Sequence, residues 1–451
     1  MRIYLEIETK KRELDSRIYF AVKAANKGYP TVFGKKSRLI EKLNYLTPGV
    51  FILKSGNKRA AELSKILKSR KFIPFASDEE GAIIMNYKDT GRRVSIDCLN
   101  SVENYFSWGK DEKNAILKNY KGVENKIIEV GNCRMDILKD PLRKIYINEA
   151  ETIKKKYGSF ILYTSAFHKY NAILDDNSKS WVEYMAARGV FQNNDFDYYK
   201  EIVKYQEINM KKTINFFKEY SRQNIDKVII VRPHPAENFD NWKSELSNLK
   251  NVKFIFDDLN TNSWILASDM MISYNCTTLL EAYLLGKEPI NLVFDQSELT
   301  KFKLTYLVSK KITQNEEMFN EIKKMNLISE AGLNRKQIDE KLTQIIHNSD
   351  KNCAADDICN FLMEKKIFRN DIQQDKFSNK FFFCFFYFKR FIKNLIYRSS
   401  NSNAFKLSKQ KNPGINFSEV KEKVELISNL TNIHNVYCDQ IYPGVFMVKK
   451  K

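Results

Sequence analysis

Glycine and proline are scarce in this sequence, with 15 and 9 residues among 451. So few residues of these two types exclude a collagen-like or low-complexity chain. They fall mostly at the ends of apolar runs, where turns separate strands from helices. With 43% hydrophobic and 13% aromatic residues, the chain can bury two ordinary cores and an appendage. The composition therefore predicts a folded α/β protein.

Cysteine is also sparse, and none of the seven cysteines forms a CxxC pair. An odd number without paired spacing favours free thiols in a reducing compartment over a disulfide framework. The sequence opens on the strand-like Arg2–Ile7, with no signal-peptide pattern there. We therefore expect a cytoplasmic protein.

Acidic residues are outnumbered, since 75 Lys and Arg face 55 Asp and Glu for a formal net charge of +20. This excess predicts attraction to an anionic partner, although lysines spread along the whole chain also fit the composition of an AT-rich genome. No nucleic-acid module and no basic stripe with stacking aromatics is visible. We expect phosphorylated substrates or an anionic membrane surface as partners, and no nucleic acid.

Two series of strand-like apolar runs alternate with helical patterns. The first series fills residues 1–150 with runs at 3–7, 29–34, 50–53, 72–75 and 126–130, and the second fills 151–350 with runs at 160–163, 227–232, 252–256, 270–273 and 289–293. Neither GxGxxG nor GxxxxGK[ST] occurs, which speaks against a dehydrogenase or a P-loop enzyme. The pattern predicts an α/β protein of GT-B architecture, with two Rossmann-like domains facing a cleft.

Residues 351–451 form a different region, predicted to be a helical and basic-aromatic appendage. The apolar core of Phe381–Lys393 is shorter than the roughly 20 residues of a membrane-spanning helix. Its basic flank favours an interfacial segment, and a helix packed back on the catalytic domains is the alternative. A helix at 418–430 and a terminal hairpin are expected further on.

The run Val228–Pro235 predicts a buried strand that ends in Arg232-Pro233-His234-Pro235. Open α/β sheets bind ligands beyond the carboxyl ends of their strands, and Arg with His suits a phosphate. The alternative is a histidine that closes the strand through a backbone hydrogen bond.

A second signal, Ser268–Ala282, predicts a strand, a hydroxyl-rich turn and a helix. Thr277 and Thr278 would lie at the start of the helix, where N–H groups, hydroxyls and the helix dipole favour an anion, or where a threonine simply caps the helix. The expected nucleotide-binding set is Arg232, His234, Pro235, Ser273, Asn275, Thr277, Thr278 and Glu281.

A third signal, Asp78-Glu79-Glu80-Gly81, follows the strand at 72–75. Three adjacent carboxylates repel one another, which raises the pKa of at least one toward the range of a general base if the site is partly desolvated. A solvated acidic turn is the alternative.

Together, Glu79-Glu80-Gly81, His234-Pro235 and Thr277-Thr278 resemble the three motifs of bacterial GT-B sialyltransferases, polysialyltransferases, Kdo transferases and related CMP-sugar transferases. The segments 12–15 (Arg-Glu-Leu-Asp) and 131–136 (Gly-Asn-Cys-Arg-Met-Asp) are similar to bacterial surface carbohydrate biosynthesis proteins. The resemblance covers roughly residues 1–300, and Asp78 beside the acidic pair departs from its pattern.

The resemblance implies a sugar transferred from a CMP donor, of nonulosonic or Kdo type, to a surface polysaccharide or lipid-linked acceptor at the inner face of the cytoplasmic membrane. Glu79, or else Glu80, would deprotonate the acceptor hydroxyl. His234 would donate a hydrogen bond to the leaving phosphate, and Thr277 and Thr278 would hold its oxygens. No metal and no cofactor is expected, since neither Asp-x-Asp nor a His/Cys cluster is present.

Three other functions remain open. A CDP-polyol phosphotransferase of teichoic-acid type shares this architecture but relies on more than one histidine, and all four histidines here lie beyond residue 150. A non-hydrolysing sugar-nucleotide 2-epimerase is weaker still. A basic membrane- or nucleic-acid-binding protein is the non-enzyme alternative.

Overall fold

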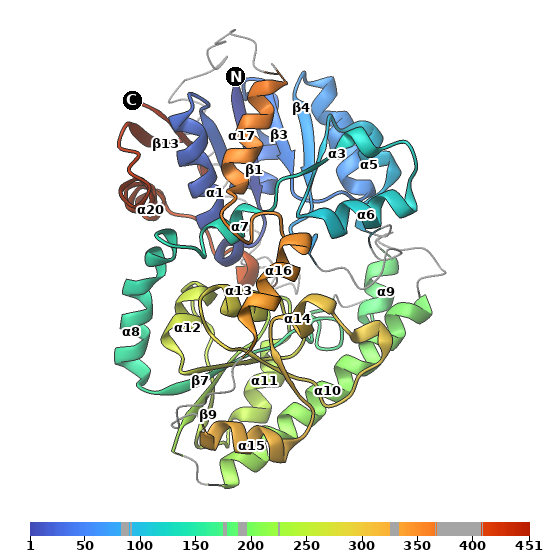
Figure 1. Cartoon of the computed structure of the whole chain (residues 1–451), viewed down its shortest axis with the longest axis vertical. Helices are drawn as coiled ribbons and strands as arrows, with labels where there is room; N and C mark the ends of the chain where they lie inside the picture. Colours follow the sequence, from blue (N-terminus) through green and yellow to red (C-terminus); the bar gives the residue numbers. More distant parts are fainter. Residues whose placement is uncertain are drawn as a thin grey trace. The chain divides into compact units, whose positions relative to one another are not determined.

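The computed structural model of the chain describes residues 1–82, 90, 93–174, 178–187, 196–223, 226–324, 333–365, 367, 407 and 409–451. These residues form two compact units (Figure 1). The first unit takes residues 1–145, the described residues of 339–401, and 412–451. The second takes the described residues of 146–338 and 402–411. Each unit has a hydrophobic core of its own.

The first unit is built on an eight-stranded sheet with the order β13-β14-β2-β1-β3-β4-β5-β6. Strands β1 to β6 run parallel, and the hairpin of β13 and β14 joins antiparallel to β2. The strands are β1 (Arg2–Ile7), β2 (Thr31–Lys35), β3 (Gly49–Leu53), β4 (Ile73–Ser77), β5 (Tyr105–Ser107), β6 (Ile127–Glu129), β13 (Val436–Tyr442) and β14 (Val445–Lys450).

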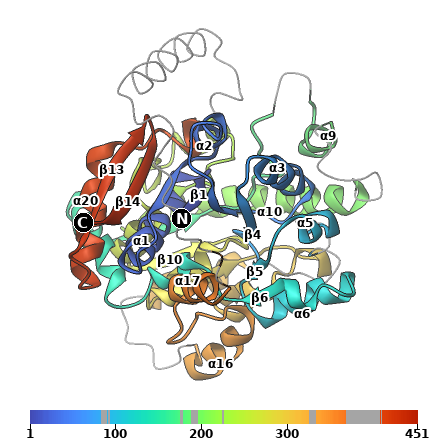
Figure 2. The same cartoon turned by 90° about the horizontal axis from the view of Figure 1, so that it is seen from above.

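Helices cover both faces of this sheet. In Figure 2, α3 and α5 lie on one face while α1 and α17 lie on the other. Several begin at side-chain caps, as α3 does where Asn57 accepts a 3.0 Å hydrogen bond from the N–H of Ala60. The helices are α1 (Lys10–Asn26), α2 (Lys36–Glu41), α3 (Lys58–Ser69), α5 (Ile96–Ser101), α6 (Lys110–Asn119), α7 (Cys133–Asp136), α17 (Ala354–Glu364) and α20 (Phe417–Leu430), with most of α16 (Arg335–Ile345).

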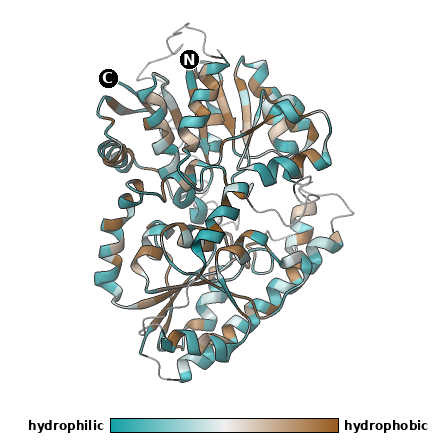
Figure 3. Cartoon of the chain, viewed as in Figure 1, coloured by the Kyte–Doolittle hydropathy of each residue, from teal (hydrophilic) through white to brown (hydrophobic). Residues whose placement is uncertain are grey.

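The second unit has a six-stranded, all-parallel sheet with the order β12-β11-β10-β7-β8-β9. Its central strand is fully buried, and Figure 3 shows hydrophobic residues concentrated on the strands, as a sheet covered on both faces requires. The strands are β7 (Phe160–Thr164), β8 (Val228–Arg232), β9 (Val252–Phe254), β10 (Met270–Ser273), β11 (Ile290–Leu292) and β12 (Lys310–Ile312).

Amphipathic helices connect these strands, and α10 is the longest of the described helices at 27 residues. Its buried positions recur every three or four residues and pack against the second core. The helices are α8 (Ile147–Tyr157), α9 (Trp181–Ala186), α10 (Phe196–Arg222), α11 (Phe239–Leu246), α12 (Thr261–Ala267), α13 (Thr278–Leu284), α14 (Lys303–Leu307) and α15 (Asn315–Lys324).

The C-terminal region differs from the expected appendage. The described residues of 351–365 and 412–451 belong to the first unit, which ends its first segment at Ile145 and not at 150. Helix α17 packs on α1, and the terminal hairpin extends the first sheet. The helix and hairpin themselves were predicted correctly, but the sheet that a hairpin joins is set by tertiary contacts that local sequence does not encode. The stretch 381–393 lies outside the described residues.

Candidate functional site

The order in which successive strands are added to the second sheet reverses between β7 and β10. From β7 the chain builds β8 and β9 to one side, then returns to place β10, β11 and β12 on the other. At such a switch point the loops after the two neighbouring strands diverge and leave room for a ligand. The residues that follow Thr164 and Ser273 therefore occupy the position where open α/β sheets bind their ligands.

Three hydroxyl side chains form a chain of hydrogen bonds at this point. Thr164 donates to Ser273 over 2.9 Å, and its Oγ1 lies 2.8 Å from that of Thr278. Ser273 is fully buried and donates in turn to the carbonyl of Thr164 over 2.8 Å. Ser273 thus joins β10 to β7 and is fully buried, whereas Thr278 is only partly buried.

The turn before α13 is held by Asn275, whose φ of +43° lies in the left-handed region that asparagine tolerates. Its amide donates to the carbonyl of Thr300 over 2.9 Å and exchanges hydrogen bonds with Asn291. The side chain of Asn275 therefore holds the turn through hydrogen bonds to Thr300 and Asn291. Thr277 occupies the N-cap position without a side-chain capping bond, and Glu281 lies buried one turn further along.

The histidine after β8 has a defined tautomer. The N–H of Ala236 donates to Nδ1 of His234 over 3.1 Å, so in the neutral ring the proton resides on Nε2. Pro235 and Pro233 restrict the backbone on either side. The backbone hydrogen bond considered from the sequence is therefore present, and it orients the ring with Nε2 as its donor.

The residues that follow β7 also lie at the switch point, although none of them was predicted as part of the site. The ring of His168 lies 4.7 Å from that of His234, and Lys169 places its Nζ 3.1 Å from Nε2 of His168. Ser165 accepts a 3.2 Å hydrogen bond from the N–H of His234 and donates to Glu237 over 2.7 Å. The strand β7 ends at Thr164 and is followed by Ser-Ala-Phe-His-Lys, so a histidine and a basic residue lie just beyond a buried strand, as in Arg-Pro-His-Pro. The sequence pattern could therefore have predicted His168 and Lys169 as site residues.

Glu237 is the buried anchor of this loop. Its carboxyl group accepts hydrogen bonds from Ser165, the N–H of Phe167 (2.9 Å) and the indole of Trp242 (2.7 Å). Burial raises the pKa of Glu237 to about 7, while these donors act in the opposite direction. The carboxyl group fixes the loops after β7 and β8 relative to each other.

The structure corrects the role expected for Arg232. Its side chain is 4% exposed, and its guanidinium pairs with Asp257 at 2.8 Å, donates to the carbonyl of Leu259 and stacks 4.5 Å above the ring of Trp264. Burial lowers its pKa, and Asp257 opposes that shift. Arg232 joins the end of β8 to the loop after β9, so its guanidinium is engaged within the protein in place of the expected phosphate.

In the first unit, each carboxylate of the acidic motif has an arginine partner. Asp78 receives two 2.7 Å hydrogen bonds from Arg93, and Glu79 pairs with Arg17. Glu80 lies 3.0 Å from Arg12 and 3.3 Å from Arg93. The guanidinium groups offset the mutual repulsion of the carboxylates, so the argument from repulsion does not hold.

The glycine of this motif is required by close packing. A Cβ at Gly81 would lie 2.6 Å from both carboxylate oxygens of Glu112 and from Cδ1 of Trp108. Burial, and then Asp78, raise the pKa of Glu112 to about 7, although Tyr105 and the N–H of Trp108 donate to it. Near the acidic motif, the carboxyl group whose pKa lies close to neutral pH is therefore that of Glu112, which was not predicted as a site residue.

The two segments that resemble surface carbohydrate proteins meet at the acidic motif. Arg12 on α1 bridges Glu80 and the buried Glu13. Burial raises the pKa of Glu13, but Lys54 and the neighbouring arginines outweigh it and hold that pKa at about 2. Arg134 donates to the carbonyl of Glu79 over 3.0 Å.

The rest of the segment 131–136 forms hydrogen bonds to residues 348–355, where the chain has returned to the first unit. Asn348 accepts from the N–H of Asn132 over 2.9 Å and donates to Asp136 over 2.6 Å. Asp136 also accepts from the N–H groups of Ala354 and Ala355 and so caps α17. This segment supports the acidic motif on one side and α17 on the other.

Among the described residues, no three His, Cys, Asp or Glu side chains are grouped as a metal site requires. No helix within the described ranges is both long and apolar enough to cross a membrane.

No family model and no curated protein sequence matches this chain. Among solved structures, it is similar to the UDP-GlcNAc 2-epimerase of Neisseria meningitidis, bound to UDP-GlcNAc, and to that of Methanocaldococcus jannaschii. Each pair shares 13% identity and a TM-score of 0.50, over 81% of this chain and 100% of the other. The wall teichoic acid polymerase TagF is 14% identical over 81% of this chain and 88% of its own, with a TM-score of 0.47. The match to the epimerases establishes the fold, and the chain has the two-domain α/β architecture of the GT-B enzymes.

Proposed function

We propose that the chain is a glycosyltransferase that moves a sugar from a nucleotide donor to a surface polysaccharide or a lipid-linked glycan. The observation that carries this proposal is the arrangement at the switch point of the second sheet. There, His234 is oriented with Nε2 as donor, within the same set of loops as the hydroxyls of Thr277 and Thr278. An Nε2–H, hydroxyls and the Lys169 ammonium suit a phosphate group. The nucleotide-bound epimerase of the same fold supports a sugar nucleotide as ligand class.

The donor is proposed to be a CMP-linked sugar of nonulosonic or Kdo type, as the motif resemblance implies. In the reaction, the bond between the anomeric carbon and the phosphate oxygen breaks, and the acceptor oxygen bonds to that carbon. CMP then leaves as a phosphate monoester whose new charge His234, Thr277 and Thr278 stabilise through hydrogen bonds. The chain's own donors are proposed to suffice without a metal or cofactor.

The acceptor proton is proposed to pass to the acidic motif of the first unit, with Glu79 as the base and Glu80 as the second candidate. Glu79 is held from two directions, because Arg17 pairs with its carboxylate and Arg134 holds its carbonyl. Its Oε2 is buried without a hydrogen-bond donor among the described residues. Such an oxygen is costly to leave unsatisfied, and an acceptor hydroxyl would supply the missing donor.

A CDP-polyol phosphotransferase is the second candidate, and one observation favours it. His168 lies against His234, so the site holds two histidines and not one. His347 also belongs to the first unit, where its N–H donates to the carbonyl of Trp108. The first unit therefore contains histidine although its segment 1–145 has none, because the chain returns to this unit at residue 339.

Nucleotide binding and turnover separate these functions. We would titrate the protein with CMP, CDP, UDP and GDP by saturation-transfer NMR, then assay CMP-sugar and CDP-polyol donors with acceptor. The proposal expects a preference for CMP and transfer of the sugar. Preference for CDP with transfer of a phosphopolyol would establish the second candidate, and conversion of UDP-GlcNAc without acceptor would establish an epimerase.

Two substitutions at His234 test the mechanism. His234→Asn can keep an acceptor for the N–H of Ala236 while it removes Nε2, and His234→Gln can return an amide donor near the position of Nε2. We expect a loss of turnover of about 10²-fold or more in His234→Asn and partial recovery in His234→Gln. Unchanged turnover in His234→Asn would remove the histidine from the mechanism. The matched control is His434→Asn in the first unit.

We propose that the protein acts at the inner face of the cytoplasmic membrane, because the proposed acceptor is a lipid-linked glycan and the chain is basic. The formal charge of +20 fits an anionic surface. Nucleic acid is not proposed as a partner.

A further inference from the structure

A pocket of about 790 Å³ lies in the second unit, at the edge of the sheet opposite to the switch point. Ser159, Lys227 and Asp269 line it, and each immediately precedes a strand, β7, β8 and β10 respectively. The volume falls within the range of small-molecule sites. Because the switch point lies at the carboxyl ends of the same strands, the pocket is separate from the proposed transfer site.

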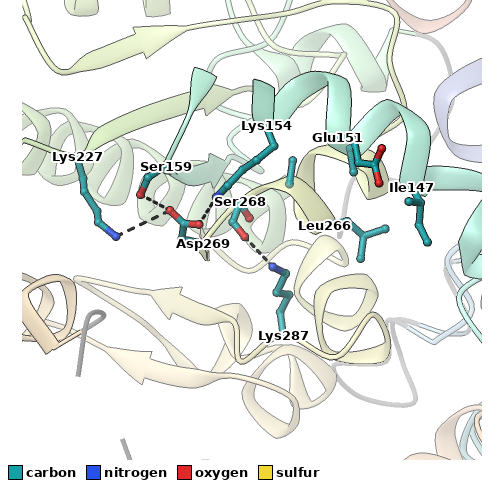
Figure 4. Close-up of a pocket in the computed structure, with 11 residues that line it drawn as sticks. Ile147, Glu151, Lys154, Ser159, Lys227, Leu266, Ser268, Asp269 and Lys287 are labelled. Carbon is teal, nitrogen blue, oxygen red and sulfur yellow. Dashed lines mark hydrogen bonds and ion pairs between the residues drawn. The ribbon is translucent and has the colours of Figure 1, made fainter. Parts of the chain in front are cut away.

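One side of the pocket is cationic. Lys154 and Lys227 both approach Asp269, the second at 3.8 Å, and Ser159 donates to the same carboxylate. Figure 4 shows these side chains gathered around Asp269, with Lys287 reaching in from below. Two ammonium groups thus share the carboxylate of Asp269, and a third, that of Lys287, lies in the same pocket.

Lys287 is the ammonium without a carboxylate partner. Its Nζ donates to the carbonyl of Ser268 over 2.7 Å, and among the described residues no carboxylate forms an ion pair with it. Burial lowers the pKa of Lys287, and Asp269 offsets only part of that shift. A partly buried cation with one neutral acceptor gains free energy when an anion enters beside it.

The other side of the pocket is apolar. Ile147 on α8 is 40% exposed, and Ala150, Leu266 and Ala267 continue the same wall. Glu151 also lines the pocket, but Figure 4 shows its carboxylate on α8, away from the lysines. Counting Glu151, the pocket still has an excess of positive charge.

We propose that this pocket binds a small molecule that carries a phosphate group, with the phosphate between Lys287 and Lys154 and the body of the ligand against Ile147 and Leu266. A phosphate monoester offers three strong acceptor oxygens and a charge of about −1.5 to −2 at neutral pH. A carboxylate offers only two oxygens, so it gives Lys287 and Lys154 fewer acceptor positions to share than a phosphate does.

Calorimetric titration of the full chain at low salt tests the proposal with four probes, namely glycerol phosphate, inorganic phosphate, acetate and glycerol. We expect glycerol phosphate to bind most tightly, inorganic phosphate next, acetate weakly and glycerol not at all. Vesicles that contain phosphatidic acid form a further arm, and binding to them but not to glycerol phosphate would place the source of the phosphate in a lipid.

Two substitutions locate the binding. Lys287→Gln should weaken binding of glycerol phosphate by about tenfold or more, which corresponds to the loss of one charge-assisted contact. Lys155→Gln, on the exposed face of α8 and outside the pocket, is the matched control. The proposal fails if neither phosphate probe nor the vesicles bind, if acetate binds as tightly as phosphate, or if the two variants behave alike. Circular dichroism confirms that each variant is folded.

Discussion

Arg17 on α1 forms an ion pair with Glu79 at the end of β4, and the two side chains are only 12% and 6% exposed. The pair holds one oxygen of the carboxylate and leaves the other, Oε2, buried without a donor among the described residues. The ion pair therefore fixes the orientation of a carboxylate that has one acceptor position still to satisfy. This geometry distinguishes Glu79 from Glu80, whose side chain is 39% exposed and shared by two arginines.

The first prediction concerns the base. Glu79→Gln keeps the size of the side chain and removes its basicity, so turnover should fall by about 10²- to 10⁴-fold while nucleotide affinity stays nearly constant. Steady-state transfer kinetics and nucleotide titration measure the two effects separately.

Glu80→Gln is the matched control, and it should lose less than about tenfold. If Glu80→Gln alone is inactive, Glu80 is the base. If both variants keep near-wild-type turnover per folded molecule, the motif serves only to hold its arginines. Thermal unfolding distinguishes loss of fold from loss of chemistry, because an unpaired Arg17 also costs stability.

Much of the fold could be predicted from the sequence. Buried parallel strands form continuous apolar runs, and the runs at 160–163 and 270–273 became β7 and β10. The short strands β5 and β12 were missed, and β12 (Lys310–Ile312) carries only one apolar residue, which is too few to form an apolar run. The rule that open α/β sheets bind ligands beyond the carboxyl ends of their strands predicts a ligand site at the loops after β8 and β10, and that site stays a prediction.

The contacts of the site could not be predicted, because they join residues far apart in the chain. Arg12, Arg17 and Arg93 reach the acidic motif from elements on either side of it. Arg232 looked like a phosphate ligand, but its partner Asp257 lies on a loop whose position depends on the folded sheet. Sequence spacing located the motifs and left their ion pairs undetermined.

The second prediction concerns Gly131, which makes room for the returning chain. Its φ is +82°, and a Cβ would lie 1.9 Å from Oδ1 of Asn348. Gly131→Ala should therefore displace Asn348 and lower the free energy of unfolding by about 1 to 3 kcal/mol beyond the backbone cost. Gly122→Ala measures that backbone cost alone, because Gly122 has a φ of +76° and open space around it. If urea unfolding shows that Gly131→Ala and Gly122→Ala lose the same free energy of unfolding, the side chain of Asn348 moves aside without an energetic cost.

The third prediction concerns pH. Burial raises the pKa values of Glu112 and Glu237 to about 7, from about 4.3 in an unfolded chain. The folded state then binds more protons than the unfolded state between these values. The stability from each group is complete below about pH 4.3 and is lost as pH rises through about 7, at up to about 1.4 kcal/mol per pH unit.

Glutamine resembles the neutral form of the acid. Glu237→Gln and Glu112→Gln should therefore each make the free energy of unfolding depend less steeply on pH. Urea unfolding between pH 4.5 and 8 measures this dependence, with the exposed Glu298→Gln as control. A constant difference between wild type and variant across this range would mean that the group keeps an ordinary pKa.

The fourth prediction concerns the membrane. The stretch 381–393 has a basic flank, and basic residues near an anionic surface contribute about 1 kcal/mol each. The full chain should float with anionic liposomes, and less so as salt increases. A chain that ends at residue 375 lacks the terminal hairpin of the first sheet, so an internal substitution of the aromatic residues 381–388 by serine is the better variant. If that variant floats as well as the wild type, the segment is not the anchor.

The last prediction separates the two threonines at the start of α13. Thr278 shares a hydrogen bond with Thr164 across the switch point, whereas Thr277 makes no capping bond. Valine has nearly the same shape as threonine and lacks the hydroxyl. Thr277→Val should therefore weaken CMP binding by about 5- to 30-fold, the equivalent of one hydrogen bond to a charged group, with little change in thermal stability. Thr278→Val should weaken binding and also lower the free energy of unfolding by about 1 kcal/mol, because the hydroxyl of Thr164 loses a partner.

Nucleotide titration and thermal unfolding of both variants measure the two effects. Unchanged CMP affinity in both variants would show that this turn does not hold the phosphate, and the binding site would then have to lie nearer to His168 and Lys169.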